Sequence, residues 1–154
     1  MLKSRWLGYR GGRLLRAGKY EAAMPFVVKA YELEPEVYSN AFNMAECFFH
    51  CNNYEEALKI FLKVEEKNSE NPDALGYIGA CLLNLGRDDE AEKYLKLAVS
   101  LFEKFPEVLY LLGKLSLKRK DEKEAHKYFK MAMEIDPSEL YRIYNKFKSL
   151  VGAK

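Results

Sequence analysis

The sequence has few cysteines and no long apolar run. Its 154 residues include three cysteines, Cys47, Cys51 and Cys81, and an odd number without a framework spacing argues against a disulfide-stapled secreted domain. No apolar segment approaches the roughly 18 residues that would indicate a membrane-spanning helix. The N-terminus also lacks the apolar core of a secretory signal. These absences favour a cytoplasmic protein.

A large net charge is also lacking. The formal net charge is +2, which is too small to indicate nucleic acid as a partner. Its distribution is uneven, because residues 1–20 carry six basic and no acidic side chains, whereas the other 134 residues carry 19 basic and 23 acidic ones and net −4. The basic start resembles an organelle transit peptide or a segment that touches anionic lipid. Both are less favoured interpretations, because the same residues continue the repeat pattern described below.

Motifs for catalysis are missing. There is no Ser-His-Asp set, phosphate loop or paired-carboxylate motif, and the glycines at residues 8–12 follow no predicted strand. Cys47, His50 and Cys51 would share one helix face, but a closed zinc site needs four ligands and no fourth is near. Cys47 and Cys81 fit small buried core residues. We therefore expect no enzyme, no catalytic site, no metal site and no cofactor.

The sequence does contain a period of 34 residues. Residues 109–137 read as two short amphipathic helices around a polar turn, and the same pattern returns at three successive steps of 34 toward the N-terminus. One small-residue column is filled at every step by Ala23, Ala57, Ala91 and Ala125. Two helices in a fixed period of this length are the signature of a solenoid.

These residues resemble the tetratricopeptide repeat (TPR) family over about residues 4–139. The family pattern W-x2-L-G-x2-Y, A-x3-F and a final P is matched by the alanine column and by a second small column, Gly11, Ala45, Gly79 and Gly113. The resemblance implies an all-α, right-handed superhelical solenoid of antiparallel helix pairs with about nine helices. It divides the chain into four repeats and a C-terminal capping helix, at 4–37, 38–71, 72–105, 106–139 and 140–154.

The spacing predicts helices over 4–17, 20–33, 37–51, 54–67, 73–85, 88–102, 107–119 and 121–134, with a ninth after Pro137. Three glycines within residues 8–12 each lower helix propensity by about 1 kcal/mol relative to alanine. We therefore expect the first helix to be frayed, shifted in register or mobile. Pro25 predicts a late start or a kink in the second helix. Gly86 predicts a left-handed helix cap.

The resemblance also implies a binding surface. In such arrays the first helix of each pair lines a concave wall, which in this family holds an extended peptide or a partner helix. The inward-facing residues predicted here are Arg5, Tyr9, Arg16, Phe42, Asn43, Glu46, Phe49, His50, Tyr77, Asn84, Tyr110, Lys114 and Lys118. Aromatic anchors with polar neighbours are typical of a peptide site; the alternative is that these rings pack between repeats.

One subset of the family grips a peptide C-terminal carboxylate with two lysines, an arginine and two asparagines. The corresponding positions here are Gly8, Gly12, Asn43, Asp73 and Tyr77. Only Asn43 fits, and Asp73 reverses the charge, so we do not expect a clamp of that kind.

The prediction is therefore a scaffold or adaptor that binds a peptide segment or helix of another protein in its concave groove. One alternative is a chaperone that holds an unfolded client segment, because residues 77–83 resemble class II type III secretion chaperones. Another is a self-assembling structural protein, in which Trp6 and the basic first helix dock onto a second copy. Light scattering and mapping of the captured segment would separate these hypotheses.

Overall fold

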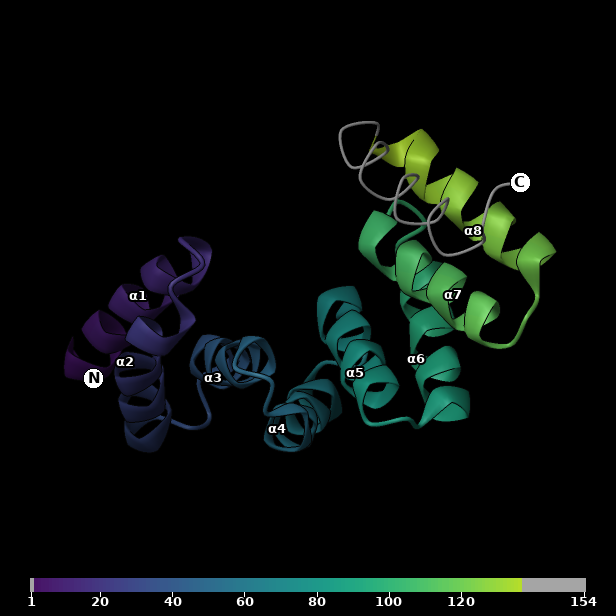
Figure 1. Cartoon of the computed structure of the whole chain (residues 1–154). Coiled ribbons are helices and arrows are strands. Elements are labelled where there is room, and N and C mark those ends of the chain that lie inside the picture. Colours follow the sequence, from purple (N-terminus) through teal and green to yellow (C-terminus); the bar gives the residue numbers. More distant parts are fainter. Residues whose placement is uncertain (1, 137–154) are drawn as a thin grey trace.

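The computed structural model describes residues 2–136, which form eight α-helices in consecutive antiparallel pairs (Figure 1). In chain order they are α1 (Leu2–Arg16), α2 (Tyr20–Leu33), α3 (Tyr38–His50), α4 (Tyr54–Lys67), α5 (Pro72–Asn84), α6 (Asp88–Leu101), α7 (Pro106–Lys118) and α8 (Glu122–Ile135). The pairs follow one another as an open array, with α1 and α2 at one end and α7 and α8 at the other. The predicted all-α solenoid is confirmed, whereas the expected capping helix lies outside the described residues.

The two helices of each pair are joined by the same tight turn. A residue with positive φ recurs every 34 positions, at Gly18, Asn52, Gly86 and Lys120. At Gly86 the backbone N–H donates to the Leu83 carbonyl at 3.2 Å, and the Arg87 N–H donates to the Leu82 carbonyl at 2.9 Å. This is the hydrogen-bond pattern of a Schellman motif, so the predicted left-handed cap is confirmed.

Small residues let the two helices of a pair approach closely. The alanines at positions 23, 57, 91 and 125 are fully buried. A Cβ added at Gly79 would lie 2.5 Å from the Leu95 side chain, and one at Gly113 would lie 2.7 Å from the Phe129 ring. Neither position could hold a larger side chain without displacing the core residue of the second helix.

The first helix is continuous and keeps the register of the later repeats, so the expectation of a frayed or shifted helix is wrong. Its Gly11 allows close contact with α2, because a Cβ at this position would lie 2.5 Å from Val27 Cγ1. Arg10 stands where later repeats carry apolar residues. Its guanidinium group lies over the rings of Trp6 and Phe26, at 5.2 and 4.5 Å from their centroids.

The second helix begins at Tyr20 and contains Pro25, so the late start that we considered is wrong. Pro25 removes the hydrogen bond that would reach the Glu21 carbonyl. Both residues are exposed, which leaves that carbonyl open to water. Between residues 2 and 136 no helix is both long and apolar enough to cross a membrane.

Candidate functional site

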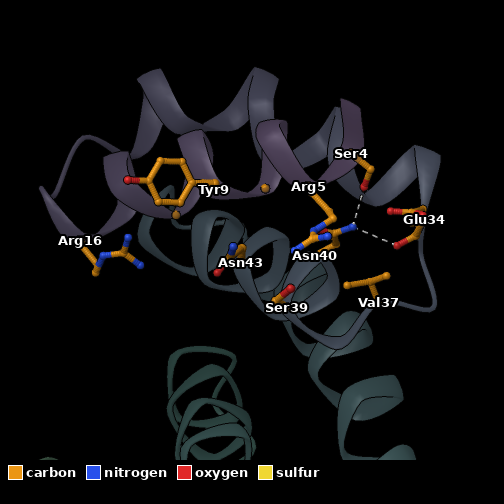
Figure 2. Close-up of a pocket in the computed structure, with 11 residues that line it drawn as sticks. Ser4, Arg5, Tyr9, Arg16, Glu34, Val37, Ser39, Asn40 and Asn43 are labelled. Atoms are coloured by element: carbon orange, nitrogen blue, oxygen red, sulfur yellow. Dashed lines mark hydrogen bonds between the residues drawn. The ribbon is translucent and has the colours of Figure 1, made fainter. Parts of the chain in front are cut away.

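A hollow of about 670 Å³ lies between α1 and α3, on the side of the array formed by the first helix of each pair. We call it the α1–α3 furrow; Figure 2 shows the residues that line it. These are Ser4, Arg5, Gly8, Tyr9, Gly12, Arg16, Glu34, Val37, Ser39, Asn40 and Asn43. The four predicted site residues among them are Arg5, Tyr9, Arg16 and Asn43.

Two glycines on the inner face of α1 let the asparagines of α3 pack directly on its backbone. A Cβ at Gly8 would lie 2.8 Å from Asn40 Oδ1, and one at Gly12 would lie 3.3 Å from Asn43 Nδ2. In the equivalent columns, α7 carries Tyr110 and Lys114. The floor of the furrow is therefore formed by backbone and asparagine side chains.

A buried polar contact holds the furrow's floor together. Asn40 is 4% exposed, and its Nδ2 lies 3.1 Å from each of three acceptors, Ser4 Oγ and the carbonyls of Ala30 and Glu34. Two hydrogens shared among these acceptors tie α1, α2 and α3 together, because a buried amide is stable only when it is hydrogen-bonded. Asn40 was not identified from the sequence. Its role could have been suspected because it is a polar residue in a column that holds alanine and valine in later repeats.

Arg5 and Arg16 are exposed on the furrow and form no ion pair within 4 Å in the described part of the chain. Arg16 Nη1 lies 3.6 Å from the place where a Gly12 Cβ would be, close to Asn43 Nδ2. Two nitrogen donors thus meet above a residue without a side chain. Such an arrangement can hold a carboxylate or a peptide carbonyl.

The predicted aromatic anchors other than Tyr9 lie outside the furrow. Phe42, Phe49 and Tyr77 are half-buried and pack with the fully buried Phe61. Tyr77 stacks on Phe61 with a centroid distance of 4.8 Å, and the centroids of Phe42 and Phe49 lie 5.8 and 5.2 Å from that of Tyr77. Because these rings join α3, α4 and α5, they contribute to the core between repeats.

Glu46 and His50 belong to the same aromatic region. The Tyr77 hydroxyl donates to Glu46 Oε1 at 3.2 Å, and the His50 ring stacks on Tyr20 with a centroid distance of 4.0 Å. Burial, followed by the nearby Glu46 carboxylate, raises the pKa of Tyr77. Burial also lowers the pKa of His50, against the opposing effect of Glu46. At neutral pH this cluster therefore favours a neutral imidazole and a neutral phenol.

The remaining predicted residues make contacts within the array. Asn84 Nδ2 donates to the Ala80 carbonyl at 2.8 Å, and the centroids of Tyr110 and Phe129 are 5.7 Å apart. The ammonium group of Lys114 lies 5.8 Å from the centroid of Tyr110. Lys118 pairs with Asp88 at 2.6 Å. None of these side chains lines the furrow.

The cysteines show the environment of core thiols. Cys47 and Cys81 are fully buried, and burial raises the pKa of each to about 12. At neutral pH both are protonated, and a protonated thiol is neither a strong nucleophile nor a metal ligand. Within residues 2–136 no group of three His, Cys, Asp or Glu side chains is placed to hold a metal ion.

Two family models match the chain. The model described as "Anaphase-promoting complex, cyclosome, subunit 3" matches residues 16–98, more than half of the sequence. A tetratricopeptide repeat model matches residues 106–139. No curated protein matches the chain.

Solved structures of MamA have a similar fold. A structure of residues 41 to the end of MamA from Desulfovibrio magneticus RS-1 is 20% identical, with a TM-score of 0.77 over 88% of this chain and 77% of that one. A MamA AMB-1 structure is 24% identical, with a TM-score of 0.70 over 84% and 76% of the two chains. At these identities the likeness shows the fold alone. Together with the two sequence matches, it shows that the chain belongs to the tetratricopeptide repeat family, whose arrays are protein–protein interaction scaffolds.

Proposed function

We propose that this protein is an adaptor that holds an extended segment of a partner protein in the α1–α3 furrow. The observation that carries the proposal is the furrow itself, a hollow of about 670 Å³ lined by arginine, tyrosine and asparagine side chains. Pockets that bind ligands combine apolar or aromatic walls with a few well-placed polar groups. Here Tyr9 and Val37 provide the apolar surface, and Arg5, Arg16 and Asn43 provide the polar groups.

The polar groups of the furrow differ in whether they are free to hydrogen-bond to a ligand. Asn40 donates to three acceptors within the fold, so it is structural. Within residues 2–136 Asn43 forms no such bond, and its side chain is half-buried beside Gly12. A free amide at the floor can pair with the N–H and C=O of an extended peptide whatever its side chains are. The furrow is therefore suited to a segment of chain rather than to a compact small molecule.

Site-specific photo-crosslinking tests the proposal. A photoreactive amino acid at Ser39, which is exposed on the furrow, should crosslink to one short segment of one partner in the native extract. The matched control places the same group at Lys59, exposed on α4. Peptide mapping of the product by mass spectrometry should find that segment at Ser39 only. Equal yields at both positions, or no product at Ser39, would refute a groove-binding role.

A second candidate function is self-association through the N-terminal flank. Leu2 and Trp6 are 85% and 53% exposed, so they form an apolar surface on α1 that no helix within residues 2–136 covers. Light scattering at micromolar concentration should then detect a dimer or polymer that Trp6→Ser dissociates. A monomer at all concentrations would remove this candidate and leave the groove proposal unaffected.

A further inference from the structure

We propose that the furrow selects a diacidic segment: an extended stretch of chain with two carboxylate side chains four residues apart, one at Arg16 and the other at Arg5. This inference rests on the proposed function and adds the chemistry of the bound segment. It follows from the direction of the furrow, from the donors at its two ends and from the charges around it.

The furrow runs along the axis of α1. Its lining residues on this helix extend from Ser4 to Arg16, a length of about 18 Å at 1.5 Å per residue. The opposite wall is formed by Val37 and the first half of α3, including Asn43. A bound chain would therefore lie parallel to α1, between the two helices.

The Arg16 end is arranged for an anion. Arg16 Nη1 and Asn43 Nδ2 both lie within 4 Å of the position of a Gly12 Cβ, so they approach the same point of the floor from opposite walls. Figure 2 shows Arg16 at one end of the furrow and Asn43 between it and Arg5. Neither side chain has a hydrogen-bond acceptor or an ion pair in the described part of the chain. A carboxylate there would accept one hydrogen bond from each wall, one of them charge-assisted.

The position of Arg5 determines how far apart the two acids of the segment must be. Arg5 is 11 residues before Arg16, three turns of helix, so the two Cα atoms are about 16 Å apart. An extended chain advances about 3.3 Å per residue, and its side chains alternate between two faces, so acids that face the same wall are an even number of residues apart. Acids at positions p and p+4, about 13 Å apart, would lie within reach of both long guanidinium side chains. The residues between them would cross the glycine floor beside Tyr9.

The surrounding charge favours an acidic ligand over a neutral one. Glu34 is the one acidic residue among those lining the furrow, against Arg5 and Arg16. Residues 1–20 contain six basic side chains and no acidic one. At the other end of the array, the equivalent of Arg16 is Lys118, which already pairs with Asp88. Among the described inward-facing residues, unpaired guanidinium groups thus occur in the first repeat.

The test measures binding of labelled decapeptides to the full chain by fluorescence anisotropy. The probe peptide carries Asp at positions 3 and 7 with Val, Thr and Leu between them. A matched peptide has Asn at both positions, and two spacing controls have the acids two or nine residues apart. We expect the probe to bind more than tenfold tighter than the Asn peptide and at least threefold tighter than either spacing control. Its affinity should fall as salt is added, because exposed charge pairs are screened.

Variants connect the effect to the two arginines. Arg5→Gln and Arg16→Gln should each weaken binding by about fivefold, the upper range for an exposed ion pair, and the double variant should abolish discrimination between Asp and Asn peptides. Arg13→Gln is the matched control, because Arg13 is exposed on the same helix but does not line the furrow. The double variant Arg5→Glu/Arg16→Glu should instead bind a peptide with Lys at positions 3 and 7.

Three results would overturn the inference: no saturable binding at millimolar probe, equal affinity for the Asp and Asn peptides, or loss of affinity in Arg13→Gln equal to that in the furrow variants. Circular dichroism of each variant separates loss of binding from loss of fold. If Ser39 crosslinks a segment without such acids, and the peptides show no charge preference, the proposed function stands and the diacidic specificity fails.

Discussion

The first and fourth repeats share one backbone plan but present different inner surfaces. Where α1 carries Gly8 and Gly12, α7 carries Tyr110 and Lys114. The Tyr110 ring packs near Phe129, and the Lys114 ammonium group lies over that ring. The inner face of the first helix is therefore bare backbone at these two positions in the first repeat and carries two side chains in the fourth. The furrow lies along the helix that lacks them.

The first and fourth repeats also differ in whether their basic side chains are ion-paired. Arg16 of the first repeat has no ionic partner in the described part of the chain, whereas its equivalent, Lys118, pairs with Asp88. The next residue in the fourth repeat, Arg119, contacts Asp89 and Glu92 at 2.6 Å each. A cation that already has an ionic partner gains less binding free energy from an acidic ligand than an unpaired cation does. Under the proposed function, ligand contact would therefore fall to the first repeat, where the guanidinium group of Arg16 is not already paired.

The largest expected effect concerns the core of the later repeats. Phe61 and its first-repeat equivalent, Val27, are both fully buried. Phe61→Ala should lower the free energy of unfolding by about 3–5 kcal/mol, since a large cavity forms and the stacked Tyr77 loses its partner. Val27→Ala should lower it by about 2 kcal/mol, because only two methyl groups are removed. Urea denaturation followed by circular dichroism measures both. Equal losses would show that the first repeat carries as much of the core as the second.

Closing the furrow with a residue from the fourth repeat sharpens the comparison. Gly12→Lys places a Cβ 3.3 Å from Asn43 Nδ2 and introduces the side chain found at position 114. We expect the diacidic decapeptide to bind at least tenfold more weakly, about 1.4 kcal/mol. Stability should change by less than about 1 kcal/mol, because the higher helix propensity of lysine is opposed by the close contact with Asn43. Anisotropy and thermal melts measure the two effects. Unchanged affinity would show that the missing side chain does not form the site.

The turn between paired helices should behave alike at both ends of the array. Lys120 has a φ of +63° and Gly18 has a φ of +69°. Lys120→Gly should raise the free energy of unfolding by about 1 kcal/mol, because a left-handed conformation strains a residue with a Cβ. Gly18→Ala should lower it by a similar amount. Chemical denaturation of the two variants tests this symmetry. A stabilising Gly18→Ala would mean that the first turn differs from the others.

The smallest expected effect is a pH dependence where the first repeat meets the second. Burial lowers the pKa of His50 below its usual 6.5, with Glu46 opposing the shift. The unfolded chain therefore binds the proton more readily, so stability should be constant above about pH 6.5 and decline as the pH falls below it. His50→Phe keeps a ring beside Tyr20 and removes the titration. Denaturation midpoints between pH 8 and 5 should then show a flatter profile for the variant, and an unaltered slope would assign the effect to other groups.

The period of 34 residues was sufficient to predict the helices. Residues 54–67 coincide with α4, because polar turns and small contact residues recur at fixed steps. The period also placed Arg5, Arg16 and Asn43 on the inner face. It could not show that Tyr77 is drawn into the core, because that depends on how Phe61 of another helix is stacked. The role of Asn40 was likewise hidden, since its acceptors come from α1 and α2 and the segment after α2.

A backbone amide titration by NMR tests the central claim most directly, because it reports where along the chain a ligand binds. Adding the diacidic decapeptide to the labelled protein should shift the amide resonances of Gly8, Gly12 and Asn43 together, with one common dissociation constant. The resonances of Lys114 and Lys118 in α7 should stay in place. Shifts concentrated in α7, or spread evenly over the array, would contradict a binding site in the α1–α3 furrow.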